Sequence, residues 1–320
     1  MTCLNHHSLT YETLSEDRSP VSVSVVLQGK MEDASAQVLA GILHAANVVT
    51  DADLYDVTMH RKLVAQATTR GGTVVFLGSQ EERWPVTAEE KKELRRMMRR
   101  ADRILLVGSA VFLPLDIGLG GTDALAIHGN FLAPMAEEYP DQPTASGTSV
   151  ESDRFSSAIS PFAAQKLLIS LIAQDFGEIT AQAVGQYVGL EEHAAAPVPS
   201  EIWKYVKKAS GDRLVCSVLK TMNKNIEEPL PISEIARIAE TSVRQVQRQF
   251  KSKTQASPQN VYREIRLNYA HNLVTRSNLP VIDVALATGF RNFGTFHENF
   301  KRQYGESPTN MRRSSFFGVR

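Results

Sequence analysis

The chain has 320 residues, of which 42% are hydrophobic and 22% are charged. This length and composition predict about two globular domains and exclude a fibrous protein or one built mainly from membrane spans. The first 20 residues have neither a basic start nor a long apolar run. We therefore expect no secretory signal, a disordered stretch over residues 1–20 and a cytoplasmic protein that does not bind membranes.

The two cysteines lie far apart, at Cys3 and Cys216, and neither has the spacing of a zinc-ligand pair. Cys3, His6 and His7 could bind a metal ion together, but a flexible polar terminus is the simpler interpretation. We therefore expect no metal and no cofactor.

Charge divides the chain into two unlike parts. Residues 220–320 hold 16 Lys and Arg against 8 Asp and Glu, which leaves 19 against 27 for residues 1–219. This asymmetry is typical of an acidic sensor or partner domain joined to a basic nucleic-acid-binding module, although charge can also scatter unevenly between ordinary domains. The stretch EEHAAAPVPSE, residues 191–201, has two prolines and no apolar period, and it predicts an extended linker over residues 191–211.

Residues 21–190 alternate between strand and helix patterns. Apolar runs at residues 21–29, 72–79 and from 103 onward predict buried strands, and LYDVTM, residues 54–59, predicts a further one. Helical patterns at residues 33–47, with Val38, Leu39, Ile42 and Leu43 as its apolar positions, and at 87–100 lie between them. This alternation, with glycines at the strand ends, predicts a parallel α/β sheet of the flavodoxin-like kind.

Residues 212–316 have helical apolar spacing throughout. Helices are predicted around residues 214–222, 232–239, 243–250, 259–276, 282–287 and 293–300, with Ile238, Ile282 and Phe293 among their apolar positions and Leu273 on the buried side of the long one. Four residues recur 50 positions apart: Phe250 and Phe300, Lys251 and Lys301, Ser257 and Ser307, Pro258 and Pro308. We interpret the repeat as two helix-turn-helix units with Phe250 and Phe300 in their cores, each followed by a Ser-Pro helix start.

This all-α region resembles the DNA-binding domain of AraC/XylS-type transcription regulators. The resemblance rests on Ser242, Arg244, Val246, Arg248 and Phe250, on Arg266, Leu267, Ala270 and Leu273, and on Val284, Ala285, Gly289 and Phe290. It implies a transcription activator that binds double-stranded DNA sequence-specifically, works with RNA polymerase and forms a homodimer.

Two helices of this region carry the expected DNA contacts. In the first helix these are Ser242, Arg244, Gln245, Gln247, Arg248 and Lys251, and in the second they are Arg291, Asn292, Thr295, His297 and Lys301. Arg pairs well with guanine and Gln with adenine in a major groove, although exposed Arg and Gln also serve only solubility. Glu298 repels phosphate, so we expect the second helix to contribute less affinity.

Residues 21–190 resemble the class I glutamine amidotransferase-like (PfpI-type) domain that some of these regulators carry as a sensor. The ends of GTVVFLGS and LLVGSAV, together with AIHGN, contain the residues of the expected ligand pocket: Gly78, Ser79, Gly108, Ser109 and His128. The superfamily's elbow cysteine is missing from LLVGSAV, which implies a non-catalytic domain that senses a small amine or nitrogen-containing metabolite or forms the dimer. The alternative is a hydrolase or amidase that uses Ser109, but no Gly-x-Ser-x-Gly elbow surrounds it.

Overall fold

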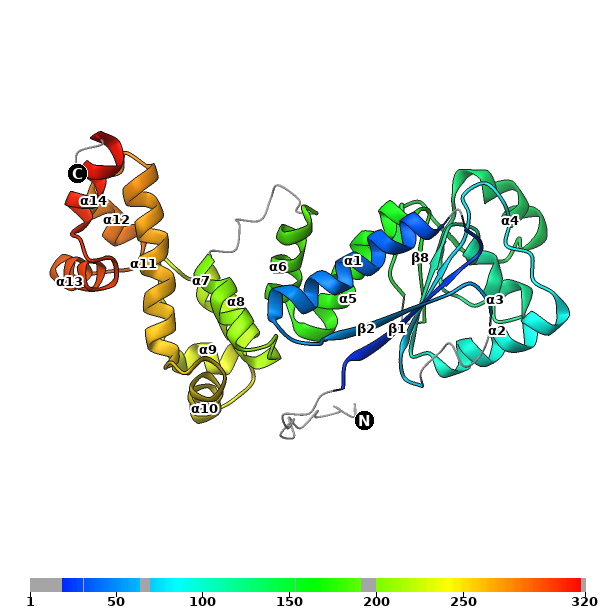
Figure 1. Cartoon of the computed structure of the whole chain (residues 1–320), viewed down its shortest axis with the longest axis horizontal. Coiled ribbons are helices and arrows are strands. Elements are labelled where there is room, and N and C mark those ends of the chain that lie inside the picture. The colour runs from blue at the N-terminus through cyan, green and yellow to red at the C-terminus, as the bar shows by residue number, and fades with distance from the viewer. Residues whose placement is uncertain (1–18, 31, 64–69, 153, 191–199, 318–320) are drawn as a thin grey trace, which may run out of the picture.

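The computed structural model describes residues 19–30, 32–63, 70–152, 154–190 and 200–317. The sequence-based expectations for residues 1–18, with Cys3, His6 and His7, and for residues 191–199 therefore lie outside the described part. An α/β region forms one end of the molecule and helices of the C-terminal half form the other (Figure 1). No helix within the described ranges is long and apolar enough to cross a bilayer.

The α/β region is built on a six-stranded sheet in the order β2-β1-β3-β4-β8-β7. The parallel strands are β1 (Val21–Leu27), β2 (Tyr55–His60), β3 (Thr73–Leu77), β4 (Arg103–Val107) and β8 (Phe155–Ala158). The short β7 (Ser149–Val150) runs antiparallel at one edge, and β5 (Leu125–Ala126) and β6 (Thr144–Ala145) form a separate pair. The order 2-1-3-4 followed by β8 is the flavodoxin-like arrangement, and it confirms the predicted fold class.

Helices cover both faces of the sheet, because the buried strands alternate their side chains between two cores. Val25 and Leu105 belong to the core under α1 (Asp33–Thr50) and α5 (Pro161–Phe176). Phe76 and Leu106 belong to the core on the other face. The helices α2 (Ala88–Arg100), α3 (Phe112–Asp116) and α4 (Leu132–Glu138) supply further residues of that second core. The predicted strands and helices of this region are all present.

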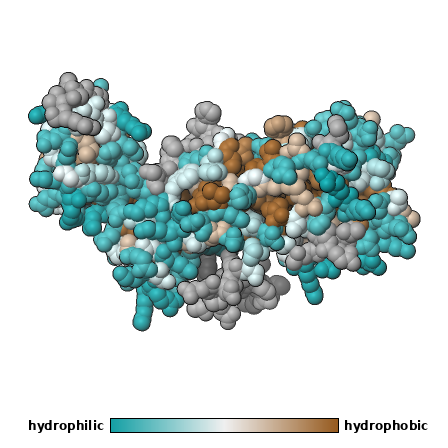
Figure 2. Space-filling view, in the orientation of Figure 1, coloured by the Kyte–Doolittle hydropathy of each residue, from teal (hydrophilic) through white to brown (hydrophobic). Residues whose placement is uncertain are grey.

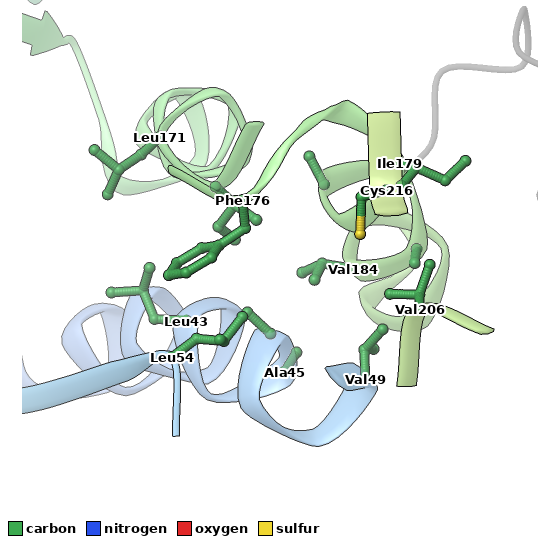
Figure 3. Packing of buried hydrophobic residues seen from close by; sticks show 14 of the residues in the cluster. Leu43, Ala45, Val49, Leu54, Leu171, Phe176, Ile179, Val184, Val206 and Cys216 are labelled. Atoms are coloured by element: carbon green, nitrogen blue, oxygen red, sulfur yellow. The ribbon is translucent and has the colours of Figure 1, made fainter. Parts of the chain in front are cut away.

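The first core does not stop at the α/β region. It continues through α6 (Glu178–Val188) into α7 (Ser200–Lys208) and α8 (Arg213–Lys224). Cys216 on α8 is completely buried beside Val184 and Ile179 of α6 (Figure 3). Lys220 on α8 pairs with Glu178 at 2.7 Å, and this hydrogen bond lowers the pKa of the Glu178 carboxyl.

The range predicted as linker, residues 191–211, therefore contains a helix that is packed against the rest of the chain. Ile202, Tyr205 and Val206 on α7 are almost fully buried, at the i, i+3, i+4 spacing of one helix face. The indole of Trp203 donates a hydrogen bond to Gln186 on α6 at 3.1 Å. The sequence already shows a short amphipathic stretch at residues 202–206, but its pattern does not show which surface the stretch packs against.

The C-terminal half contains the two predicted helix-turn-helix units. The first consists of α9 (Ile232–Ile238) and α10 (Val243–Thr254), and the second of α12 (Val281–Ala287) and α13 (Phe293–Tyr304). The long α11 (Pro258–Arg276) connects them, and α14 (Pro308–Phe317) follows the second. Ser257 and Ser307 cap α11 and α14, each accepting a backbone hydrogen bond, so the repeated Ser-Pro helix starts are confirmed.

The burial of these helices differs from the apolar pattern at a few positions. Phe250 and Phe300 are fully buried as predicted, but Ile238 is 48% and Ile282 is 56% exposed. Phe293 on α13 is also exposed. Leu273, predicted on the buried side of α11, is half-buried, and the neighbouring Val274 is fully buried instead. In the α/β region, Val38 on α1 is likewise exposed although its spacing is apolar. A seven-residue helix in a small unit buries only about two turns of one face, so an apolar residue outside that face remains in solvent.

Candidate nucleic-acid interface

The first recognition helix, α10, begins at Ser242, whose hydroxyl accepts a hydrogen bond from the backbone N–H of Gln245 at 3.2 Å. Val246 and Phe250 hold the helix in the core. The opposite face presents four predicted contact residues to solvent, Arg244, Gln247, Arg248 and Lys251. This face offers guanidinium and amide donors of the kind that read base edges in a major groove.

Two glutamines on α10 have structural partners. Arg248 donates to the side-chain oxygen of Gln245 at 3.2 Å, so Gln245, which is half-buried, orients the Arg248 guanidinium. Gln249 donates to the carboxylate of Asp212 at 2.7 Å, and Asp212 also caps α8. The recognition helix is therefore tied to the helix that packs on the α/β region, a connection that sequence spacing did not reveal.

The second recognition helix, α13, begins at Asn292, whose side-chain oxygen accepts from the N–H of Thr295 at 2.9 Å. Arg291, Thr295 and Lys301 are exposed, and His297 is half-buried against Phe293. Glu298 is exposed on the same helix. Two of the predicted contact residues, Ser242 and Asn292, thus serve as helix caps at equivalent positions, 50 residues apart.

The helix α11 holds the two units at a fixed spacing. Its first half, with Val261 and Ile265, packs with the first unit, and its second half, with Ala270 and Val274, packs with the second. Its 19 residues correspond to about 28 Å. One turn of B-DNA is about 34 Å, so helices held near the two ends of α11 are suitably spaced for successive major grooves.

Direct contacts between the units fix their orientation. The Arg266 side chain on α11 donates to the carbonyl of Thr288 at 2.8 Å and lies 4.1 Å from the centre of the Phe290 ring. Gly289 has φ +73°, and a Cβ there would lie 2.5 Å from Pro229, which precedes the first unit in the chain. Only glycine fits this turn, because any side chain would push the units apart.

Several of the predicted ligand-binding residues of the α/β region pack closely on one another. Gly108, directly after β4, has φ +60°, and a Cβ there would lie 2.7 Å from the carbonyl oxygen of Gly78 and 2.8 Å from that of Ser79. The strained residue of the elbow is thus a glycine without a side chain. Ser109 follows it and is completely buried.

Gln28, at the end of β1, occupies the space between the carboxyl ends of β1 and β3, where flavodoxin-like folds bind ligands. Its side-chain oxygen accepts from the Ser109 hydroxyl and from the Ser79 N–H, both at 2.8 Å. Its amide donates to the carbonyl of Arg83 at 3.2 Å. The sequence pattern did not single out Gln28, because its role depends on contacts with residues 51 to 81 positions away.

His128 lies apart from Ser109. Its Nδ1 accepts from the Asn130 N–H at 3.3 Å, and Asn130 donates to the carbonyl of Gln80 at 2.8 Å. Among the hydrogen bonds of the described residues, none joins His128 to Ser109. Four of the five predicted ligand residues, Gly78, Ser79, Gly108 and Ser109, lie at the carboxyl ends of β3 and β4 and pack on one another there.

A cavity of about 280 Å³ lies at the opposite, amino-terminal edge of the sheet. Arg103, Arg154, Glu151, Ser156 and Gln174 are among its lining residues. Arg103 is held by Asp175 at 2.7 Å. Aliphatic side chains also line the cavity, and its charged lining residues are two arginines and one glutamate.

The comparisons with known proteins point to one family. A sequence model of a helix-turn-helix domain matches residues 235–314. The transcriptional regulator GlxA of Rhizobium meliloti is 27% identical over 75% of this chain and 74% of its own length. The regulator GbdR of Pseudomonas aeruginosa is 23% identical over 95% of this chain and 87% of its own length.

The solved structure of an AraC family transcriptional regulator from Pseudomonas putida is similar to part of this chain, with 20% sequence identity and a TM-score of 0.46. The match covers 53% of this chain and 100% of the solved chain. The matched helix-turn-helix domain coincides with α9 to α14, and the regulator relatives extend over most of the chain. The amidotransferase-like character of residues 21–190 stays a prediction. These similarities support an AraC-type regulator, with a mostly parallel α/β N-terminal region and a helical C-terminal region that contains the matched helix-turn-helix domain.

Proposed function

We propose that the chain is a sequence-specific transcription activator that binds double-stranded DNA through α10 and α13 and works with RNA polymerase. The observation that carries this proposal is the face of α10, where Arg244, Gln247 and Arg248 are exposed on a helix fixed by buried Val246 and Phe250. The domain assignment is part of the proposal: residues 212–316 read DNA, and residues 21–190 sense a metabolite or form a homodimer.

Arg248 provides the test of sequence-specific reading. Arg248→Ala should weaken binding to the operator by about 1–3 kcal/mol and relax the preference at one base pair. Fluorescence anisotropy with operator and random duplexes measures both effects. Arg237→Ala is the matched control, because Arg237 is exposed in the same unit but lies on α9 and pairs with Glu234. An equal loss of affinity for the operator and the random duplex would mean that Arg248 contacts phosphate and does not read a base.

We infer that the α/β domain is non-catalytic. A serine nucleophile needs an adjacent base and access to substrate. Ser109 is completely buried and donates its hydroxyl hydrogen to Gln28 at 2.8 Å. A panel of ester and amide substrates should give no turnover, whereas turnover that disappears in Ser109→Ala would establish the hydrolase alternative.

We propose a different location for the effector site, because Ser109 at the elbow is buried and hydrogen-bonded to Gln28. The cavity of about 280 Å³ beside Arg103 and Arg154 is near the lower end of the volumes of small-molecule sites. We propose it as the place where a small metabolite with both a charged nitrogen and a carboxylate would bind, since Glu151 and Arg154 both line it. Thermal stabilisation by such metabolites that is lost in Arg154→Ala would support this site.

A further inference from the structure

The outward face of α2 carries positive charge within a region that is otherwise acidic. Residues 1–219 hold 19 basic against 27 acidic residues, yet the 13 residues of α2 hold six basic against three acidic ones. Leu94, Met97 and Met98 bury one side of this helix in the second core. The opposite side, which we refer to as the α2 basic face, exposes five basic residues: Lys92, Arg95, Arg96, Arg99 and Arg100.

The acidic residues of α2 leave most of this positive charge without a partner. Glu90 forms a capping box with Thr87 at the start of the helix, and Glu93 pairs with Arg96. Four basic side chains of the face form no ion pair with any described residue: Lys92, Arg95, Arg99 and Arg100. Like charges on neighbouring turns repel one another, and the helix dipole offsets this repulsion only in the last turn.

The arrangement of these charges suits a polyanion. From Lys92 the basic residues recur at i+3, i+4, i+7 and i+8, so they form a stripe along one side of the helix, about 12 Å long. Successive phosphates of one DNA strand lie about 3.4 Å apart along the duplex axis, so the stripe can lie opposite about three or four of them. The space-filling view shows hydrophilic residues over this end of the molecule, whereas hydrophobic residues gather over its middle part (Figure 2).

DNA held by the recognition helices passes the α/β region. Two recognition helices in successive major grooves follow one another along the duplex axis. In the protein, α13, α10 and the α/β region follow one another along the longest axis of the molecule (Figure 1). The duplex that continues beyond α10 therefore runs on the side of the α/β region.

Charge selects the surface of the α/β region that can meet this DNA. Outside α2, residues 1–219 hold 13 basic against 24 acidic residues, so the rest of this surface repels phosphate. We propose that the α2 basic face binds the phosphates of DNA that flanks the operator. This inference rests on the proposed function, because the recognition helices bring that DNA to the α/β region.

The test compares two duplexes in salt titrations of the full-length chain. One carries only an operator selected from a random DNA pool, and the other adds about 20 base pairs, or about 68 Å, on each side of it. Wild-type affinity should fall more steeply with salt on the extended duplex, by at least about 0.9 in the slope of log affinity against log salt concentration, the value for one phosphate contact. Arg99→Gln should reduce this difference by up to about 0.9 and leave binding to the short duplex unchanged.

Two control variants separate a phosphate contact from a change in net charge. Lys166→Gln removes one positive charge from an exposed position on α5, across the sheet, and should keep the wild-type slope on both duplexes. Arg99→Lys keeps the charge of the α2 basic face and should also keep the wild-type slope.

A wild-type slope for Arg99→Gln on the extended duplex would overturn the inference and would mean that DNA is not the partner of the α2 basic face. An equal loss of slope in Lys166→Gln and Arg99→Gln would also overturn it, because the effect would then follow net charge alone. Failure of the proposed function has a different readout, namely equal affinity of wild type for the short operator and for a random duplex of the same length.

Discussion

Replacing Phe300 by alanine should unfold the second helix-turn-helix unit and leave the rest of the chain folded. The core of that unit has eight buried hydrophobic residues, and Phe300 is one of the fully buried ones. Its ring lies 5.6 Å from that of Phe296 and 4.8 Å from that of Tyr304. Truncating a buried Phe to Ala costs about 3–5 kcal/mol. A unit of about 50 residues has only about 3–8 kcal/mol of stability, so this loss is enough to unfold it.

Phe250→Ala is the matched comparison, because Phe250 has the equivalent position in the first unit. It is also fully buried, but its core continues through α8 and α6 into the α/β region. A similar loss of about 3–5 kcal/mol is therefore shared by a much larger cooperative core. We expect Phe250→Ala to lower the main unfolding transition without selective local unfolding.

Hydrogen–deuterium exchange read by mass spectrometry distinguishes the two variants. In Phe300→Ala, peptides from α12 to α14 should exchange rapidly while peptides from α1 to α6 keep their wild-type protection. In Phe250→Ala, faster exchange should extend into α6 and α8. Faster exchange of the α/β region in Phe300→Ala, or a response confined to α9 and α10 in Phe250→Ala, would refute the division into one large and one small core.

Two further predictions concern DNA affinity and the junction between the two regions. Glu298→Arg should tighten DNA binding and steepen its salt dependence, by up to about 0.9 in the slope of log affinity against log salt concentration, as for one added phosphate contact. An unchanged slope in salt titrations would mean that α13 lies away from the DNA phosphates. Burial raises the pKa of the Cys216 thiol to about 12. In a Cys3→Ser variant, Cys216 should therefore react with a thiol reagent only when α8 separates from α6. Lys220→Glu places a second carboxylate beside Glu178 and should speed labelling of Cys216 up to about fivefold, and adding Glu178→Lys should restore the slow rate. Equal labelling rates in the parent protein, the single variant and the double variant would mean that the Lys220–Glu178 ion pair does not hold α8 on α6.

Local signals in the sequence predicted much of the C-terminal half. Ser242, Ser257 and Ser307 are helix caps because a Ser side chain satisfies a backbone N–H within three residues, so each cap depends on its own neighbours alone. The 3.6-residue period likewise identified Phe250 and Phe300 as core. The period could not tell that Ile238 and Ile282 stay exposed, since that depends on where the partner helices end.

Contacts distant in sequence were beyond such patterns. The filling of the elbow depends on Gln28, 81 residues before Ser109, and glutamine has no periodic signature. The docking of α7 and α8 on α6 depends on a small face with Ile202, Tyr205 and Cys216. The sequence therefore predicted the helices of the two helix-turn-helix units, but neither the contacts of Gln28 nor the shared core that joins the two regions.

Selection of bound duplexes from a random DNA pool by the full-length chain tests sequence-specific reading by α10 and α13 most directly. The enriched sequences should share a motif with two elements whose centres lie about one helical turn apart, one for each recognition helix. The pool selected by Arg248→Ala should lose the preference at one base pair within one element. Recovery of a pool without any shared motif would contradict the proposal that this chain reads DNA sequence.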